Sequence, residues 1–149
     1  MKKLLFGLCV LSLAHLPVSA QRVQPRGVPA VVLNVFQQQF PKARQVEWEK
    51  KRDGNYEVEF DIGLFSRDHQ AIISPEGKVL RHEEELAPYS LPDAVKQRIK
   101  AEFDGYRVDD AKKVDTGGTV TYEVELDSRS GDLEVVFAAN GEIIKERMD

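Results

Sequence analysis

The chain has 149 residues, a formal net charge of −4 and one cysteine, Cys9. An acidic balance argues against a nucleic-acid-binding surface, and a single cysteine cannot build a disulfide framework within the chain or a thiolate metal site. We therefore expect no nucleic acid among the partners of this protein.

The first 20 residues have the order of a cleavable export signal. Lys2 and Lys3 precede an apolar run from Leu4 to Leu16, and small residues end the segment at Ala20. This order predicts a secretory signal peptide over residues 1–20, and its apolar run is too short to span a bilayer. Cleavage after Ala20 leaves 129 of the 149 residues, without cysteine, and changes the net charge from −4 to −6 because two lysines are lost. We expect a periplasmic or secreted protein that does not insert into a membrane after signal removal.

A flexible lead is expected over residues 21–27, followed by a helix. Apolar residues recur at helical spacing from Pro29 to Phe40, and Pro41 ends the pattern. Pro29 suits a first helical turn, where a missing N–H donor costs nothing. A helix of about three turns is not stable alone, so it must pack on another element.

Strands follow this helix. Val46 and Trp48 alternate with glutamates, and the same period of two runs over residues 56–61 after an Asp-Gly-Asn turn. Alternation around such a turn predicts a β-hairpin, with Trp48 in the core and Tyr56 towards the helix. Two further strands are expected over residues 69–74 and 78–82, and a linker over residues 83–89.

The second half of the chain repeats this order. A Ser-x-x-Asp capping box at residues 90–93 and an apolar stripe predict a helix that ends near Phe103. Period-two patterns and turn residues then predict four strands, at residues 107–115, 119–127, 132–138 and 142–146.

Three matches in the same order indicate an internal duplication. Pro29 to Phe40 aligns with Pro92 to Phe103 at an offset of 63, Tyr56-Glu57-Val58-Glu59 with Tyr122-Glu123-Val124-Glu125 at 66, and the glycine-led residues 77–80 with 141–144 at 64. The predicted fold is α+β, with two tandem helix-plus-four-stranded antiparallel repeats over residues 28–85 and 86–149. The two sheets either stay separate or join into one curved sheet with the helices on one face.

An export signal followed by two such units, with the Tyr-Glu-Val-Glu and Gly-x-Val/Ile-x signatures, resembles the PepSY-like, β-lactamase-inhibitor-protein-like periplasmic family. The resemblance covers nearly all of the chain after residue 20. It implies a curved sheet with helices on its convex side and a concave face open to a protein partner. It also implies restraint of peptidases, and a calcium-regulated role in some relatives. The inhibitor after which the family is named relies on disulfides, which this chain lacks after signal removal.

The closest approach to a catalytic group is Ser66-Arg67-Asp68-His69. On an extended strand, neighbouring side chains point to opposite faces, whereas a triad needs its base to reach both partners. We therefore predict no catalytic residue, no cofactor and no enzymatic activity, and interpret His69 and His82 as surface or edge-strand residues. A serine hydrolase using Ser66 and His69 is the alternative.

Carboxylates dominate the predicted solvent face of both sheets. Like charges directly opposite each other in a sheet are unfavourable, so their presence in both repeats indicates a face that awaits a basic partner or a cation. The alternative is an ordinary polar solvent face, neutralised by Arg44, Lys50, Lys51 and Lys112. No Asp-x-Asp-x-Asp-Gly loop is present, so no metal ligands are predicted. The candidate partner-binding carboxylates are Glu47, Glu49, Glu57, Glu59, Glu123 and Glu125.

The loop after the Tyr-Glu-Val-Glu strand differs between the repeats. The first repeat has Leu64 and Phe65 close to Arg67, whereas the second has the polar residues 128–131. Apolar and aromatic side chains beside an arginine are typical of an interface anchor. The alternative is that Leu64 or Phe65 folds back over a sheet edge or onto the other repeat.

Together these patterns predict a non-enzymatic exported binding module. It would dock a protein or peptide through the open sheet face and the Leu64-Phe65 loop, as an inhibitor or regulator of a periplasmic enzyme. The alternative function is a calcium-responsive or ligand-sensing periplasmic domain.

Overall fold

The structure is a computed structural model that describes residues 21–63, 67–129 and 131–148. The predicted signal peptide and the candidate residues Leu64 and Phe65 lie outside the described residues. The first repeat contains β1 (Gln21–Arg22), the 3-10 helix η1 (Pro25–Gly27), α1 (Ala30–Gln39), β2 (Arg44–Lys50), β3 (Tyr56–Ile62), β4 (Arg67–Ile73) and β5 (Val79–Glu85). The second contains η2 (Pro88–Ser90), α2 (Asp93–Glu102), β6 (Arg107–Thr116), β7 (Thr119–Asp127), β8 (Leu133–Ala138) and β9 (Ile143–Met148).

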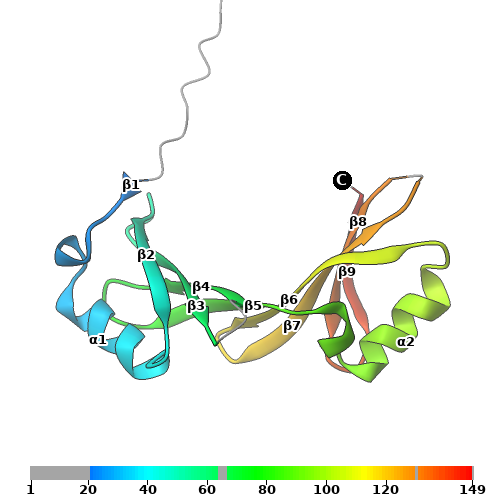
Figure 1. Ribbon diagram of the computed structural model, residues 1–149, viewed down its shortest axis with the longest axis horizontal. Helices are drawn as coiled ribbons and strands as arrows, with labels where there is room; N and C mark the ends of the chain where they lie inside the picture. The colour runs from blue at the N-terminus through cyan, green and yellow to red at the C-terminus, as the bar shows by residue number, and fades with distance from the viewer. Residues whose placement is uncertain (1–20, 64–66, 130, 149) are drawn as a thin grey trace, which may run out of the picture.

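The strands form one antiparallel sheet in chain order from β1 to β9. Figure 1 shows an elongated molecule in which α1 and α2 lie at opposite ends of the sheet, on the same side, while the other side is open and curved. The predicted α+β fold of two helix-plus-four-strand repeats is therefore confirmed, and the two sheets are joined.

Each helix packs one apolar stripe on its end of the sheet. Val32 and Phe36 of α1 and Val95 and Ile99 of α2 are buried. The capping box predicted at residues 90–93 does not form, because the helix begins after Pro92 without a side-chain cap. Among the described residues, no helix is long and apolar enough to cross a membrane.

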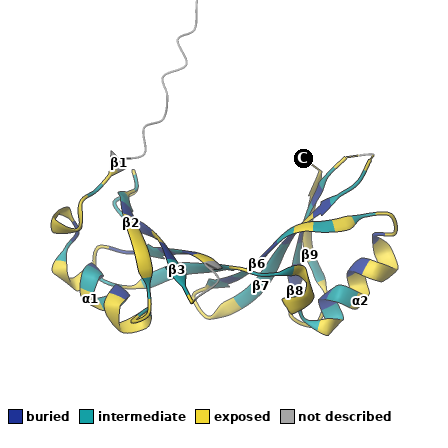
Figure 2. Ribbon diagram, in the orientation of Figure 1, coloured by how far each residue is buried: buried dark blue, intermediate teal, exposed yellow. Residues whose placement is uncertain are grey.

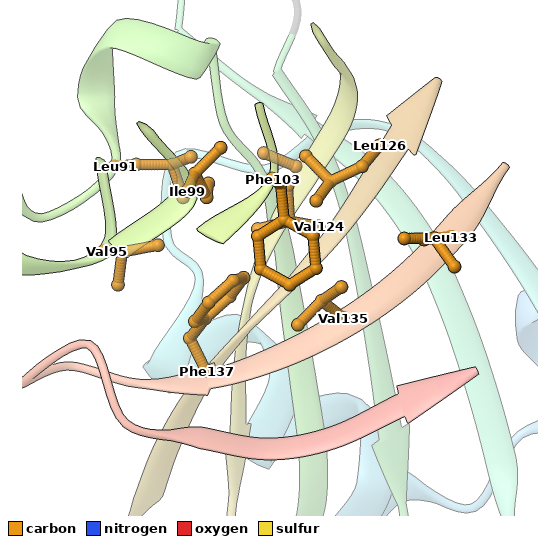
Figure 3. Packing of buried hydrophobic residues seen from close by; sticks show 10 residues of the cluster. Leu91, Val95, Ile99, Phe103, Val124, Leu126, Leu133, Val135 and Phe137 are labelled. Atoms are coloured by element: carbon orange, nitrogen blue, oxygen red, sulfur yellow. The ribbon is translucent and has the colours of Figure 1, made fainter. Parts of the chain in front are cut away.

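Two separate cores result from this packing. In the second core, the rings of Phe103 and Phe137 meet edge to face, with their centroids 6.3 Å apart (Figure 3). In the first, Trp48 is only 4% exposed and packs on Phe36, as predicted for a core residue. The buried residues of the first core are Val28, Val32, Phe36, Trp48, Tyr56, Val58, Phe60, Ala71 and Ile73, and those of the second are Leu91, Val95, Ile99, Phe103, Ala111, Val124, Leu126, Leu133, Val135 and Phe137.

The register of the strands places both cores on one face. Residues directly opposite each other on neighbouring strands share a face of the sheet. One unbroken row of such partners joins the two cores, and it consists of Phe60, His69, Glu84, Lys113, Tyr122 and Phe137. The face that carries the helices is therefore continuous, and so is the open face.

Strand β5 connects the two repeats, and this corrects the predicted linker. Glu83 to Glu85, expected to lie in an extended connection, belong to β5 and pair with β6. The pairing is charge-complementary, with Glu84 opposite Lys113 and Glu85 opposite Lys112. Most of β5 is half-buried, as the middle of the sheet in Figure 2 shows, because neither helix covers it. A strand with no strongly apolar face does not show the alternation by which strands are recognised.

Residues 21–27, for which a flexible lead is predicted, contain β1 and η1. Gln21 and Arg22 pair with β2, Val23 donates its N–H to the Trp48 carbonyl at 2.9 Å, and residues 25–27 form η1. In the second repeat, Leu86 donates in the same way to the Ala111 carbonyl at 2.7 Å, at an offset of 63 residues on both sides. β1 therefore covers β2 in the same way as the end of β5 covers β6.

Candidate functional site

The open face is acidic because the strands alternate. In β3, the core takes Tyr56, Val58 and Phe60, so Glu57, Glu59 and Asp61 project to the opposite face. The register adds Glu47 and Glu49 of β2, which lie opposite Glu59 and Glu57. In the second repeat, Tyr122, Val124 and Leu126 face the core, which leaves Glu123 and Glu125 on the open face. All six predicted glutamates therefore lie on the open face.

A hollow of about 610 Å³ lies on this face. Its lining comes from β2 to β6 and carries seven carboxylate residues against a single lysine. We call it the acidic hollow. It is lined by Gln45, Glu47, Glu59, Phe60, Asp61, Asp68, His69, Gln70, Glu83, Glu85, Asp110 and Lys112.

Like charges stand directly opposite each other in the first repeat. The register pairs Glu47 with Glu59, and Asp61 with Asp68. Such pairs destabilise a sheet by some tenths of a kcal/mol, about 0.2–1 kcal/mol each. Arg22 lies 3.0 Å from Glu47 and offsets part of the repulsion between Glu47 and Glu59.

Lys51 offsets the negative charge of two glutamates on the outer part of the open face. Its Nζ lies 3.1 Å from Glu57 and 3.4 Å from Glu49, which stand opposite each other in the register. The hydrogen bond to Glu57 is the main reason that the pKa of Lys51 is raised. Glu57 is only 9% exposed, so this carboxylate serves the sheet itself and is poorly placed to meet a partner.

Arg81 offsets negative charge at the centre of the open face and links the two repeats by ion pairs. Its guanidinium lies 2.7 Å from Glu83 on the same strand and 2.9 Å from Glu123 on β7. The carboxylates of Glu83 and Glu123 raise the pKa of Arg81 against the opposing effect of burial, which is the largest single influence. Glu123 is thereby held in an ion pair across the junction.

Three carboxylates of the acidic hollow differ from these. Glu59, Asp68 and Glu85 are exposed, and within the described ranges no ion pair or hydrogen bond of their carboxylates is found. Elsewhere in the acidic hollow, Lys112 lies 3.5 Å from Asp110. Glu59 and Asp68 stand opposite other carboxylates, whereas Glu85 stands opposite Lys112.

Comparison with known proteins identifies the family. The model of the family described as "Putative beta-lactamase-inhibitor-like, PepSY-like" matches the chain twice in tandem, at residues 17–81 and 76–145. The two matches cover most of the chain, one for each repeat. The chain belongs to this PepSY-like family.

Solved structures share the fold of this PepSY-like protein at low sequence identity. A DUF2874 family protein from Bacteroides uniformis is 21% identical, with a TM-score of 0.71 over 80% of this chain and 88% of that one. A BLIP-like protein from Bacteroides fragilis is 18% identical, with a TM-score of 0.71 over 80% and 85%. One of the "putative periplasmic proteins" from Bacteroides eggerthii is 16% identical, with a TM-score of 0.71 over 81% and 88%. No curated protein sequence matches the chain.

The prediction for the histidines of this PepSY-like protein is corrected, because neither lies on an edge strand and His69 is buried. His69 is 8% exposed and lies on the helix face, with its Nδ1 3.2 Å from Nε2 of His82. The two rings are nearly parallel, and Phe60 stacks on His69 at 5.3 Å. Their strands lie inside the joined sheet, so neither histidine is at an edge.

The strand register also separates Asp68 from His69, whereas a catalytic triad needs its carboxylate and its histidine in contact. Asp68 lies on the open face and His69 on the helix face, as strand alternation predicts, and His69 is hydrogen-bonded to His82. Ser66 lies outside the described residues, and of the candidate Arg67 only the backbone at the start of β4 is described.

A metal role for the carboxylates has no geometric support in the residues that the structure describes. No group of three or more His, Cys, Asp or Glu side chains there is arranged to hold a metal ion. The carboxylates of the open face are spread along strands, whereas calcium binding needs several oxygens that converge on one point.

Five carboxylates of the acidic hollow were absent from the predicted site: Asp61, Asp68, Glu83, Glu85 and Asp110. Alternation within β3 contained the signal for Asp61. Glu83 and Glu85 could not be found without knowing that β5 is a strand paired on both sides. The acidic hollow therefore extends beyond the predicted candidate residues, towards the junction of the repeats.

Proposed function

We propose that this protein is a non-enzymatic exported binding module that docks a cationic segment of a partner protein in the acidic hollow. The observation that carries the proposal is a set of exposed carboxylates on one concave face, Glu59, Asp68 and Glu85, which form no ion pair with any residue that the structure describes. Opposed carboxylates repel each other in the free protein, and a lysine or arginine placed between them removes that repulsion.

The arrangement favours a protein or peptide over a small ion. The carboxylates come from several strands and surround a hollow of about 610 Å³, which suits a ligand that carries several positive charges at intervals. A field of one sign on a concave surface also accelerates the approach of an oppositely charged partner, and salt weakens this effect.

Family membership supports a regulatory role for this binding. The family is described as "beta-lactamase-inhibitor-like", and one similar structure is described as BLIP-like. We propose that the partner is an exported enzyme with a basic rim and that docking inhibits or regulates it. An exported location is supported by the periplasmic description of a similar structure and by the sequence pattern of residues 1–20.

Binding of an oligolysine peptide, followed by nuclear magnetic resonance, tests the site. We expect shifts at Glu59, Gln70 and Glu85 that saturate at low salt and weaken as salt increases. The double variant Glu59→Lys, Glu85→Lys should bind about tenfold more weakly, equivalent to about 1.4 kcal/mol.

The matched control is the double variant Asp104→Lys, Glu142→Lys, which makes the same change of charge at exposed positions outside the acidic hollow. Equal loss of affinity in both double variants would show that only net charge matters and would overturn the proposed site.

A photo-crosslinking residue at Gln70, in the acidic hollow, identifies the natural partner among exported proteins of the producing cell. The same residue at Lys100, exposed on α2, is the control. We expect a partner captured from Gln70 alone, with an activity that changes when the purified protein is added. A partner with no such response would retain the binding role and remove the regulatory one.

A further inference from the structure

The outer edge of β9 is an unpaired strand edge with apolar side chains. In the part of the chain that the structure describes, β9 is the last strand of the sheet and pairs only with β8. Ile144 is 56% exposed and Met148 is 75% exposed. An exposed edge offers unpaired main-chain N–H and C=O groups, which makes it a template for another strand.

The equivalent strand in the first repeat, β5, shows that such an edge pairs with an antiparallel strand. β9 is the equivalent of β5 at an offset of 64, because Gln70 opposite Glu83 matches Glu134 opposite Arg147. In β5 the outer edge is occupied by β6. The chain therefore contains one filled and one open copy of the same acceptor edge.

The main-chain groups that face outward follow from this equivalence. Leu86 donates its N–H to Ala111 on β6, and alternate residues of a strand turn their main-chain groups to the same side. Glu84 and His82 therefore also bond to β6. Their equivalents Met148 and Glu146 present outward N–H and C=O groups on β9.

A second copy of this chain does not fit the open edge. Symmetric antiparallel pairing of β9 with itself places Lys145, Glu146 or Arg147 opposite its own copy or, when it is centred on Ile144, places Glu142 opposite Glu146. Like charges opposite each other are unfavourable in each of these registers. Head-to-tail pairing requires the edge of β2, where β1 already pairs, with Arg22 opposite Glu49.

We propose that β9 adds an extended segment of a different protein as a tenth strand, antiparallel to residues 143–148. Within the β5–β6 junction, two glutamates stand opposite lysines, Glu84 opposite Lys113 and Glu85 opposite Lys112, so that opposite charges meet there. The same rule applied to β9 selects an acidic residue opposite Lys145, a basic one opposite Glu146 and an apolar one opposite Met148. This surface is distinct from the acidic hollow.

The probe is an acetylated peptide with the core Val-Glu-Lys-Glu-Val, mixed with the whole protein and followed by nuclear magnetic resonance. We expect saturable shifts at the amides of Glu146 and Met148. The charge-inverted core Val-Lys-Glu-Lys-Val should bind about tenfold more weakly. Shifts confined to the acidic hollow, or no saturable shift with the first peptide, would overturn the proposal.

N-methylation of the peptide separates main-chain pairing from side-chain attraction. Methylation at the central Lys, whose N–H faces Glu146, should abolish binding, whereas methylation at a neighbouring Glu, whose N–H faces away from β9, should leave most of it. Equal affinity of the two methylated peptides would contradict strand addition. Because the protein is unchanged in this comparison, misfolding cannot explain the result.

Charge reversal on the protein completes the test. Lys145→Glu should weaken the first peptide and strengthen the inverted one, while Lys100→Glu on α2 should change neither. The variant Glu59→Lys, Glu85→Lys should bind both peptides with unchanged affinity. This distinguishes a failure of strand addition at β9 from a failure of the proposed function at the acidic hollow.

Discussion

At the scale of single residues, the paired histidines make the stability of the helix face sensitive to pH. Burial is the main cause of the lowered pKa of His82, and the neighbouring His69 lowers it further. Glu84 and Asp115 oppose this effect, and Lys113 adds to it. The hydrogen bond between the two imidazole rings requires an unprotonated nitrogen as acceptor, so it is lost when both histidines are cationic.

The free energy of unfolding should therefore fall as pH decreases below the ordinary value of 6.5. The unfolded chain binds a proton at His82 before the folded protein does, and stability is lost through the interval down to the lowered pKa. His82→Gln, which keeps a hydrogen-bond partner for His69, should show a flatter dependence. Urea unfolding at about pH 7.5 and about pH 5 measures this, and an unchanged slope in the variant would contradict it.

At the scale of elements, the glycine that begins the repeated motif at residues 141–144 allows the β8–β9 turn to contact α2 closely. Gly141 has φ of +84°, and a Cβ there would lie 2.6 Å from the Ala94 carbonyl oxygen. The Gly141 carbonyl also accepts a hydrogen bond from Nε of Arg98 at 3.0 Å. In the first repeat, Gly77 makes the corresponding approach to Val31 on α1. The repeated glycine is therefore needed for the close contact of turn and helix.

Gly141→Ala should destabilise the protein more than Gly105→Ala. Both glycines have positive φ, which costs an alanine about 1–2 kcal/mol, but a Cβ at Gly105 meets nothing within 4 Å. The collision with Ala94 should add about 1 kcal/mol or more. Thermal and urea unfolding of the two variants give the difference, and equal losses would show that the backbone at Ala94 moves aside freely.

At the scale of the whole molecule, the β5–β6 junction makes two small cores into one sheet. Glu84 and Lys113 stand opposite each other on the helix face, away from the acidic hollow. Glu84→Lys places like charges opposite each other and should cost about 1 kcal/mol or less. The double variant Glu84→Lys, Lys113→Glu should recover most of the loss. If both single variants and the double variant lose stability additively, the pair does not hold the junction.

The joined sheet also predicts cooperative unfolding across the repeats. Leu126 is fully buried in the second core, and Leu126→Ala should cost about 2–5 kcal/mol. The only tryptophan, Trp48, reports on the first core. Its fluorescence transition should move as far as the circular dichroism transition if the sheet unfolds as one unit. A fluorescence transition that stays in place would show that the repeats unfold separately.

The sequence alone determined the repeated unit and the direction of its side chains. Helical spacing and strand alternation are local, so they placed both helices, Trp48 in the core, and Glu47 and Glu59 on the open face. The same locality explains the errors. β5 lies where no helix covers the sheet, so its three successive glutamates have no alternation and resemble a linker.

Only the tertiary structure decided how the units combine. The pairing of β5 with β6 joins residues from different repeats, and no local pattern encodes it. This pairing brings Asp110 and Lys112 of β6 to the acidic hollow beside Glu85, and it occupies the edge of β5 whose counterpart on β9 stays open. The acidic face follows from a chain-local period of two, whereas the hollow and the free edge depend on which strands become neighbours.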